Sequence, residues 1–547
     1  MMKHEKSCGA VIFRKTGSGV LYLVEEMMKG HHSMCKGHVE AGETEHETAR
    51  REIREETGLT VSFLNGFRET DSYSPAPGVV KQVVFYLAEA TGGTEKPQPE
   101  EVKAIRWLPF EEAHALLTYE TDRKILRDAE DFRALPERLS FVKQAESLMR
   151  SSIGAVMPGE AVRAALRRLS PLRPGGRNLL VAVGKAAWEM ADAACGLLGD
   201  EISEGFVVTK YGHSRGDIPR CRIFEAGHPV ADEKTFRATE EILSATDRLR
   251  EEDRVLFLVS GGGSALFEKP LIEEAEYLDV TERLLRSGLP IGEFNAVRKH
   301  LSAVKGGRFA AHCLPASVFA VLLSDVLGDR PDVIASGPVS PDASTSEEAL
   351  SVLKKAGISL SPEAEAQIRK ETPKETPNAE CVIAGSVRFL CEAAADAARS
   401  MGYEPVLVTD RLEAEAKEAG KTFASLAISH TGGPKAYIAG GETVVRVTGN
   451  GLGGRCQETA VACAEGIKGL SGRFFFSFGS DGTDGPTDAA GGYADGETAE
   501  KLEKENDPVP DVLKSNDSYH ALEKIGQLLM TGPTGTNVND LCVLFCR

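Results

Sequence analysis

Three glutamates with helical spacing are the first residues in this chain whose pattern indicates chemistry. Glu52, Glu55 and Glu56 stand at i, i+3 and i+4 within the segment KGHVEAGETEHETARREIREETGL, residues 36–59. On a helix this spacing projects the three carboxylates from one face, where like charges repel by about 0.2–0.5 kcal/mol per pair. A divalent cation would remove the repulsion, and Mg²⁺ prefers carboxylate oxygens as ligands. A solvated charged face is the alternative, and the surrounding sequence decides between the two.

Local signals delimit the helix that must carry these glutamates. Thr44 and Glu47 have the spacing of a capping box, and Gly58 is a typical C-terminal stop. These signals predict a helix from about Glu45 to Thr57.

The glutamates also belong to a longer pattern of fixed spacing. Gly37, five residues, Glu43, seven residues and then REIREETGL at 51–59 match the Nudix box completely. The chain therefore resembles Nudix hydrolases over roughly residues 3–135. The resemblance implies an α/β/α sandwich that hydrolyses a nucleoside diphosphate linked to another group. It implies Glu52, Glu55 and Glu56 as Mg²⁺ ligands, with Glu55 also a candidate catalytic carboxylate, and Arg51 with Glu43 as the pair that holds the loop.

Flanking segments are similar to one branch of that family. SCGAVIFRK, the KGH at 36–38 and EEVKAIRWLPFEEAHALL from Glu100 are similar to the diadenosine tetraphosphate hydrolases. Glu101 is the candidate for a further metal-binding carboxylate from outside the box. Met34-Cys35 stands before KGH where that branch usually has a proline, which leaves the substrate less defined than the chemistry.

Size and composition restrict the class of protein. The chain has 547 residues, 41% of them hydrophobic and 27% charged, which indicates a globular protein of two to four domains. No apolar run reaches the length of a membrane span and the start lacks a signal peptide, so we expect a cytoplasmic protein. Eleven cysteines without a CxxC pair indicate reduced thiols. A net charge of −18 argues against nonspecific nucleic-acid binding.

Beyond residue 175 short apolar runs alternate with longer amphipathic segments. NLLVAV, GFVVTK, RVLFLV, SVFAVLLS, CVIAG, PVLVT, AYIAG and RFFFSF are such runs. The alternation predicts a mostly parallel sheet covered by helices. The preceding segment from Asp128 has helical periodicity and little Gly or Ser, so we place a boundary near Pro136 without a flexible linker and expect the two parts to pack together.

Two segments that follow apolar runs carry residues suited to anions. Lys185 follows NLLVAV and opens a helix, where a cation is unfavourable unless it meets an anion. A lysine that reaches solvent is an equal alternative. RVLFLV is followed by SGGGSAL, whose glycines let backbone N–H groups converge on phosphate oxygens, although a structural turn is also open. That loop comprises Ser260, Gly261, Gly262, Gly263 and Ser264.

Carboxylates and a second cation follow the later runs. Asp325 comes after SVFAVLLS and suits a general base, a metal ligand or a helix cap. Asp481, Asp484 and Asp488 lie in GSDGTDGPTDAAGG, whose spacing is not that of an EF-hand and indicates a Mg²⁺-nucleotide site instead. Arg455 stands at the start of an expected helix in GLGGRCQE.

These segments together resemble a second family. VGKAAWEM, VSGGGSAL, NAVRKHLSAVKGGR, LSDVLGD, GGRCQE, SFGSDGTDGPTDAAG and TGPTGTNVNDL stand in the order found in the glycerate kinases that carry a C-terminal MOFRL domain, from about residue 140 onward. The resemblance implies transfer of the ATP γ-phosphoryl group to D-glycerate, usually at the 2-hydroxyl. Lys185 and Arg455 would hold the carboxylate and the transferring phosphate, and Asp325 would be the base. The glycine-rich loop, Asp481 and Asp484 would bind the nucleotide.

The sequence thus predicts a bifunctional α/β protein that uses Mg²⁺ in both parts and ATP as phosphoryl donor. We expect a Nudix domain over 1–136, a Rossmann-like domain over 137–400 and a smaller α/β MOFRL domain over 401–547. Expected partners are D-glycerate, ATP and a nucleoside polyphosphate, with a homodimer as a further expectation and no nucleic acid or membrane. The alternative is a glycerate kinase whose Nudix domain is a nucleotide-sensing or oligomerisation module.

Overall fold

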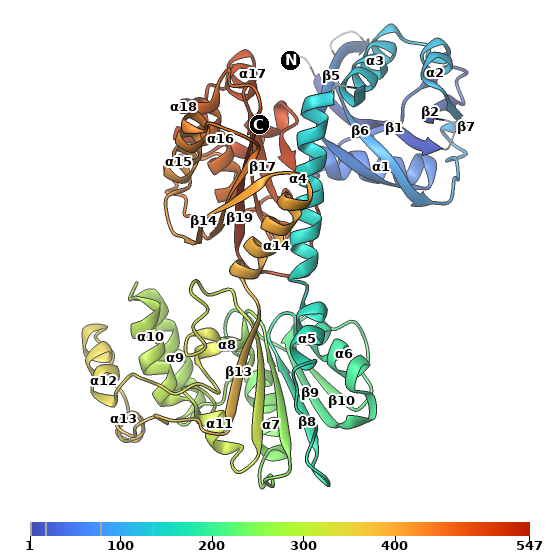
Figure 1. The fold of residues 1–547 in the computed structure, drawn as a ribbon. Helices are drawn as coiled ribbons and strands as arrows, with labels where there is room; N and C mark the ends of the chain where they lie inside the picture. Colours follow the sequence, from blue (N-terminus) through green and yellow to red (C-terminus); the bar gives the residue numbers. More distant parts are fainter. Residues whose placement is uncertain (1–2, 17–18, 77–78, 135) are drawn as a thin grey trace.

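The protein consists of three α/β units (Figure 1). The first unit comprises residues 3–134, the second residues 158–385, and the third residues 136–157 together with 386–546. The computed structural model describes residues 3–16, 19–76, 79–134 and 136–547. None of the helices in these described ranges has the length and apolar content needed to span a bilayer.

The first unit is a sandwich of a seven-stranded mixed sheet between two helical layers. The strand order is β3-β2-β1-β6-β5, with β4 paired to β1 and β7 to β2. Side chains alternate across β1: Val11 and Phe13 pack with α2 and α3, whereas Ala10 and Ile12 pack with α1. The expected α/β/α sandwich is confirmed. Its elements are β1 (Lys3–Thr16), β2 (Gly19–Met27), β3 (His32–Ser33), β4 (Lys36–His38), α1 (Glu45–Thr57), β5 (Leu59–Ala76), β6 (Val79–Gly93), β7 (Val102–Leu108), α2 (Phe110–Leu116) and α3 (Glu120–Ala134).

The second unit contains the predicted parallel sheet. Its strand order is β10-β9-β8-β11-β12-β13. The chain first adds strands on one side of β8 and then, from β11 on, on the other side, as in a Rossmann fold. Every residue of β8 and of β11 is buried, because helices cover both faces. The strands are β8 (Asn178–Val183), β9 (Ile202–Lys210), β10 (Cys221–Ala226), β11 (Arg254–Val259), β12 (Ser317–Leu323) and β13 (Ala379–Gly385).

The helices of the second unit form two covering layers and a side cluster. Helices α5 and α6 pack on one face of the sheet, and α7, α8 and α11 on the other. Helices α9, α10, α12 and α13 share a separate core. The bounds are α5 (Pro158–Leu166), α6 (Ala187–Leu198), α7 (Glu233–Ala245), α8 (Gly263–Leu266), α9 (Glu274–Arg286), α10 (Ile291–Leu301), α11 (Arg308–His312), α12 (Ser346–Lys355) and α13 (Pro362–Ile368), with 3₁₀ turns η1 (Gly199–Glu201) and η2 (Ile334–Ser336).

The third unit is a mixed six-stranded sheet in the order β14-β15-β19-β16-β17-β18. Only β14 and β15 pair in parallel among these described strands, and the other neighbours are antiparallel. The prediction of a mostly parallel sheet is therefore wrong for the sheet that contains PVLVT, AYIAG and RFFFSF, because β19 inserts antiparallel between β15 and β16. Its elements are α4 (Pro136–Ala155), α14 (Val387–Ser400), β14 (Glu404–Leu412), α15 (Ala416–Ser429), β15 (Lys435–Gly441), α16 (Arg455–Ile467), β16 (Arg473–Gly479), β17 (Gly491–Asp495), α17 (Thr498–Lys504), α18 (Val509–Ser515), α19 (Ser518–Lys524), β18 (Leu528–Leu529) and β19 (Asp540–Cys546).

Helix α4 belongs to the core of the third unit, although it directly follows the first unit in sequence. Phe141 stacks on Phe474 of β16 with ring centroids 5.4 Å apart, and it shares a hydrophobic core with α14 and β19. Figure 1 shows α4 as a long helix running beside α14. The expectation that the parts pack without a flexible linker agrees with this packing. The domain boundaries at 136 and 400 stay predictions. In the structure the chain leaves the third unit for the second near Met157 and re-enters the third unit near Gly385.

Polar contacts also join the first unit to the third. Glu45 is buried at the start of α1 and accepts hydrogen bonds from Arg68, 2.8 Å away, and from the Tyr86 hydroxyl at 2.7 Å. Arg68 then donates to the Lys524 carbonyl at 3.3 Å. The face of the first unit near the start of α1 therefore packs on the third unit around α19.

Candidate functional site

The helix predicted to carry the three glutamates of the Nudix box is confirmed. Helix α1 spans Glu45–Thr57, with both hydrogen bonds of the capping box between Thr44 and Glu47. Gly58 ends it in the left-handed conformation, with φ of 72°. The boundaries follow from these residues because an N-cap oxygen satisfies free N–H groups and glycine adopts positive φ without strain.

Arg51 connects the loop before α1 to the helix. Its guanidinium donates to Glu43 at 2.7 Å, to Glu52 at 2.8 Å and to Glu55 at 3.1 Å. Gly37 lies so close to the helix that an added Cβ would be 2.0 Å from the Glu52 carboxyl carbon. The loop and helix thus hold each other in the way that the Nudix resemblance implies for Arg51 and Glu43.

The three glutamates of α1 differ strongly in environment. Glu56 is buried, with 2% of its surface exposed, and accepts a hydrogen bond from the Lys36 backbone N–H at 3.1 Å. Glu55 is 52% exposed and faces Arg51. Glu52 lies between these extremes, and Glu101 from outside the box is close enough to act on both Glu52 and Glu56. Besides burial, the charge of Glu101 thus raises the pKa of both Glu52 and Glu56, and Glu55 lies on the exposed side of α1 beside Arg51.

The carboxylates of this site are held in an environment that disfavours their charge. Burial raises the pKa of Glu56 to about 7, and burial raises the pKa of Glu52 above its usual range. Clustered carboxylates of this kind fit a divalent cation, because a cation removes both the repulsion and the cost of burial. Glu52, Glu56 and Glu101 are the residues that would hold it.

The second candidate site lies in the second unit, on loops at the point where the strand order of the parallel sheet reverses. Lys185 follows β8 and Ser260 follows β11, the two strands between which the strand order reverses. Lys185 N–H donates to the Gly261 carbonyl at 2.9 Å, and the Ala186 N–H donates to Ser260 Oγ at 3.0 Å. The two loops therefore form one surface at the carboxyl ends of the strands, where open α/β sheets bind ligands.

Glycines allow this surface to approach charged side chains closely. A Cβ on Gly261 would lie 2.5 Å from Asp325 Oδ2 and 3.7 Å from Lys185 Cε. Gly262 has φ of 85°, and a Cβ there would lie 2.9 Å from the His228 ring. The Gly261 backbone thus lies close to both the Asp325 carboxylate, the candidate base, and the Lys185 side chain, the candidate cation.

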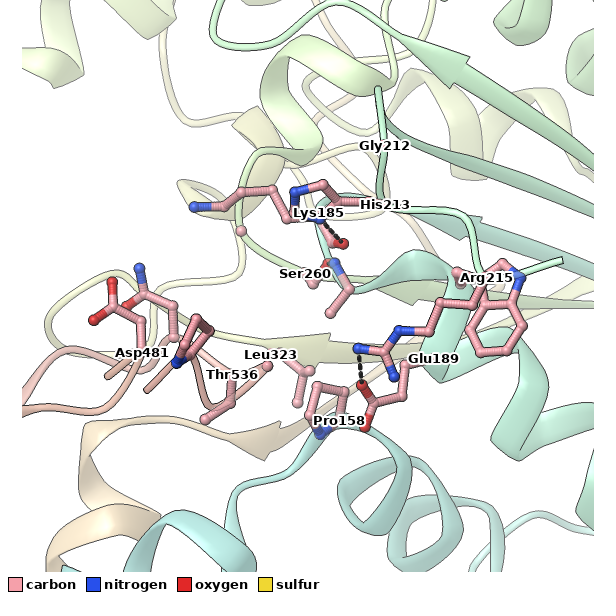
Figure 2. A pocket seen from close by; sticks show the side chains of 16 residues that line it. Pro158, Lys185, Glu189, Gly212, His213, Arg215, Ser260, Leu323, Asp481 and Thr536 are labelled. Carbon is pink, nitrogen blue, oxygen red and sulfur yellow. Dashed lines mark hydrogen bonds and ion pairs between the residues drawn. The ribbon is translucent and has the colours of Figure 1, made fainter. Parts of the chain in front are cut away.

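A cavity of about 390 Å³ lies between the second and third units at this surface. Figure 2 shows Lys185 and Ser260 on one side and Asp481 and Thr536, on the ribbon of the third unit, on the other. Its lining residues are Pro158, Lys185, Ala186, Trp188, Glu189, Gly212, His213, Arg215, Ser260, Gly261, Leu323, Asp481, Pro533, Gly535, Thr536 and Asn537.

Asp325 lies in an adjoining cavity of about 270 Å³ that Ser260 and Gly261 also line. Burial raises the pKa of the Asp325 carboxyl, although Lys185 acts in the opposite direction. The rest of the glycine-rich loop, through Ser264, lines this second cavity as well. Lys185, Asp325 and the loop are therefore brought together, as the sequence predicts.

Arg455 starts α16, as expected, but its charge is already paired. It binds Asp540 through two guanidinium nitrogens, one of them at 3.0 Å, and Glu442 at 2.6 Å. Asn539 links Glu442 to the Asp325 carbonyl, with contacts of 3.4 Å and 3.3 Å. Arg455 thus lies beside the Asp325 region through two intervening residues and lines neither cavity described above.

The aspartates of the loop after β16 have different surroundings. Asp481 lines the cavity between the units. Asp484 is buried and accepts the N–H groups of Cys456 and Gln457 at 3.1 Å and 2.8 Å, so it caps α16. Burial raises the pKa of Asp484 to about 7 although these N–H groups lower it. Asp488 contacts the first unit instead.

Sequence reasoning did not single out three polar residues beneath the glycine-rich loop. Arg298 donates to the Ser264 carbonyl at 2.6 Å, and Lys305 donates to the Gly263 carbonyl at 3.3 Å. Asn295 lines the Asp325 cavity. Burial lowers the pKa of Lys305 to about 7. All three lie in NAVRKHLSAVKGGR: Asn295 and Arg298 are on α10, and Lys305 is in the turn between α10 and α11. The available signal is the presence of polar residues among the apolar ones of this segment.

Comparison with known proteins assigns each part of the chain. Family models match the NUDIX domain at residues 3–129, the Domain of unknown function (DUF4147) at 144–369 and the MOFRL family at 435–540. The D-glycerate 2-kinase of Thermotoga maritima is 51% identical over 416 residues, which cover 75% of this chain and 98% of that protein.

A solved structure and a second relative extend the comparison. The crystal structure of the Thermotoga maritima glycerate kinase matches with a TM-score of 0.72 over 75% of this chain and 100% of that one, at 51% identity. A protein of Agrobacterium vitis named for hydroxypyruvate reductase is 37% identical over 417 residues, covering 73% of this chain and 93% of that protein. The second and third units therefore match full-length relatives, to which the first unit is an addition.

Proposed function

The chain belongs to the glycerate 2-kinase family, and we propose that its second and third units transfer the γ-phosphoryl group of ATP to the 2-hydroxyl of D-glycerate. One observation carries the proposal: Lys185, Ser260 and Asp481 line a cavity between the two units at the switch point of the sheet. Such a position suits a reaction that must exclude water while two substrates meet.

In the proposed reaction the 2-hydroxyl oxygen of glycerate bonds to the γ-phosphorus as the bond to the bridging oxygen breaks and ADP leaves. The hydroxyl proton passes to Asp325, whose burial favours accepting it. Lys185 neutralises charge on the transferring group, and N–H groups of the glycine-rich loop hold phosphate oxygens.

The third unit would contribute metal binding and positioning. Mg²⁺, when bound, supplies charge neutralisation to the phosphates, and Asp481 is our candidate to hold it because it lines the cavity. We assign Asp484 to holding α16 in place, since both its oxygens accept backbone N–H groups of that helix. Arg455, on the same helix, would act on the phosphate or carboxylate only after exchanging part of its contact with Glu442.

Purified protein incubated with ATP, Mg²⁺ and D-glycerate tests the kinase proposal. We expect 2-phosphoglycerate, identified by phosphorus NMR, and its loss in Asp481→Asn. The relative named for hydroxypyruvate reductase defines the competing outcome: oxidation of NADH or NADPH by hydroxypyruvate, with no phosphorylated product, would overturn the proposal.

A second activity is supported by the first unit. We infer that it hydrolyses a nucleoside polyphosphate with a divalent cation, of which diadenosine tetraphosphate is one candidate. The joint presence of Glu52, Glu56 and Glu101, with Arg51 holding the loop, supports catalysis, because a sensing or oligomerisation module does not need this complete set.

Glu55→Gln/Glu56→Gln tests this second activity. The variant should lose nucleotide hydrolysis while kinase turnover stays within a few-fold of the parent. In the absence of metal it should also be more stable at pH 8, since the ionised Glu56 carboxylate is unfavourable when buried. Unchanged hydrolysis would exclude the metal role, and no hydrolysis by the parent of any nucleotide in a broad panel would favour the sensing module.

A further inference from the structure

A buried thiol lies between two buried carboxylates on the inner side of α1. The group consists of Glu25 of β2, Cys35 between β3 and β4, and Glu56 of α1. One ligand atom from each side chain lies within 4.8 Å of the others. No other group of three such side chains comes as close within the described ranges.

Glu25 makes this group unusual. Its side chain is 0% exposed, and within the described residues no N–H or O–H group donates to either carboxylate oxygen. The Cys35 thiol is close enough to lower the pKa of Glu25 by a hydrogen bond. Burying an ion without a partner is strongly unfavourable. Lys36 is nearby, but its ammonium contacts Ser33 Oγ and the Met34 carbonyl, the latter at 3.3 Å, instead of either carboxylate. A positive charge bound between Glu25 and Glu56 would remove the penalty.

We propose that Glu25, Cys35 and Glu56 form a second cation site in the first unit, selective for a thiophilic divalent ion of the Zn²⁺ class. A charge of +2 offsets most of the −3 that two carboxylates and a thiolate carry together. Thiolate is also a ligand that Zn²⁺ accepts and Mg²⁺ does not favour. Three protein ligands also match a tetrahedral Zn²⁺ site with one remaining position. Binding releases to water the protons that the ligands carry, and no electron transfer is involved.

Glu56 is the one residue that this site shares with the Mg²⁺ site of the proposed Nudix function. Glu56 Oε2 accepts the Lys36 N–H, and the charges of Glu52 and Glu101 act on the same carboxyl group. Glu25 and Cys35 lie on the inner side and are not part of the proposed Mg²⁺ set. The inner ion should therefore bind whether or not the unit hydrolyses nucleotides.

Cadmium binding to the full-length chain tests the proposal. After treatment with a chelator, Cd²⁺ should give the ultraviolet charge-transfer band of a thiolate-bound ion. Zn²⁺ should displace the Cd²⁺, and a large excess of Mg²⁺ should not. Cys195 and Cys221 of the second unit, whose sulfurs lie 3.6 Å apart, are replaced by serine in every sample so that this pair of thiols does not contribute to the band.

Variants decide whether the band arises from this group. Cys35→Ser should lose one equivalent of bound Cd²⁺, whereas Cys8→Ser, which removes another buried thiol of the same unit, should keep it. Glu25→Gln should fold, because it removes an unpaired buried charge, and should weaken binding by at least the roughly 10–100-fold typical of losing an outer-shell partner. If Cys35→Ser does not fold, Glu25→Gln decides.

Glu55→Gln separates this proposal from the hydrolase. It should reduce hydrolysis yet leave the cadmium band unchanged, since Glu55 is exposed and faces Arg51. Equal cadmium stoichiometry and affinity in the parent, Cys35→Ser and Glu25→Gln would overturn the thiol site, whatever the outcome of the hydrolysis assays.

Discussion

Thr44 Oγ1 lies 3.0 Å from Asp488 Oδ2, so a hydrogen bond joins the N-cap of α1 in the first unit to the loop after β16 in the third. The other oxygen of Asp488 accepts the Tyr519 hydroxyl at 2.7 Å. The same loop carries Asp481, which lines the cavity of the kinase site. Helix α1 of the first unit and the loop after β16, which lines the cavity between the second and third units, are therefore in direct contact.

The Thr44–Asp488 contact should appear as an energetic coupling between the units. In a double-mutant cycle of Thr44→Ala and Asp488→Ala, we expect a coupling of about 0.5–1.5 kcal/mol in the free energy of unfolding, measured with urea. Loss of the helix cap by itself cancels in the cycle.

Thr345→Ala provides the control for that cycle. Thr345 caps α12 in the second unit with the same kind of capping box, so its loss should add to that of Asp488→Ala without coupling. A coupling near zero for both pairs would show that the contact between the units contributes nothing to stability.

Glu523 should make the interface between the first and third units sensitive to pH. Burial and then the charge of Glu45 raise the pKa of Glu523 to about 7, although Arg68, Lys6 and His520 act in the opposite direction. The folded protein therefore binds this proton more tightly than the unfolded chain, in which the pKa is about 4.3. The associated stability is present below that value and is lost as pH rises through about 7.

Glu523→Gln should remove this dependence. We expect a higher melting temperature than the parent at pH 8 and little difference at pH 4, measured by calorimetry. Glu505→Gln, at an exposed glutamate of the same unit, should leave both values unchanged. A stabilisation of equal size at both pH values would mean that Glu523 is not the titrating group.

Gly261→Ala should impair the kinase without unfolding it. The new methyl group would meet Asp325 Oδ2 at 2.5 Å and displace the candidate base, and displacements near 1 Å lower rates by about 10²-fold. Gly196→Ala is the matched control, because a Cβ there meets nothing within 4 Å and α6 should be slightly stabilised. Full activity in Gly261→Ala would exclude Asp325 as the base.

Lys185 and Arg455 should respond differently to removal. Lys185→Ala should lower turnover by about 10²–10³-fold with little change in melting temperature. Arg455→Ala should lower both, since it leaves the buried Asp540 without its cation, and a buried group that loses its hydrogen-bond partner costs about 1–3 kcal/mol.

Arg455→Ala/Asp540→Asn separates stability from chemistry. The neutral amide should restore much of the melting temperature, and turnover should stay low if Arg455 serves the reaction. Recovery of turnover together with stability would assign Arg455 a purely structural role.

Features encoded by neighbouring residues were predictable from the sequence. The bounds of α1 follow from Thr44, Glu47 and Gly58, which lie within the helix or next to it. The positions of Lys185 and Asp325 follow from the rule that loops at the carboxyl ends of parallel strands meet.

Features that depend on distant pairing were not predictable in the same way. Glu25 lies in an apolar run, but its burial results from pairing opposite Ser33 on β3 and Ile105 on β7. The contacts of Arg455 with Asp540 and of α4 with β19 join segments far apart in sequence, so no local pattern indicates them.

The position of β19 has a consequence for how the protein is made. This strand lies between β15 and β16 at the centre of its sheet, and it leaves the ribosome after every other strand of that sheet. The apolar face of α4, including Phe141, packs against β19 and is synthesised long before it. Helix α14 and strand β16, which also pack on α4, are made before β19, so the part of the α4 face that contacts β19 is the last to be covered. Nascent chains should therefore engage cellular chaperones through this part of α4 until β19 is made.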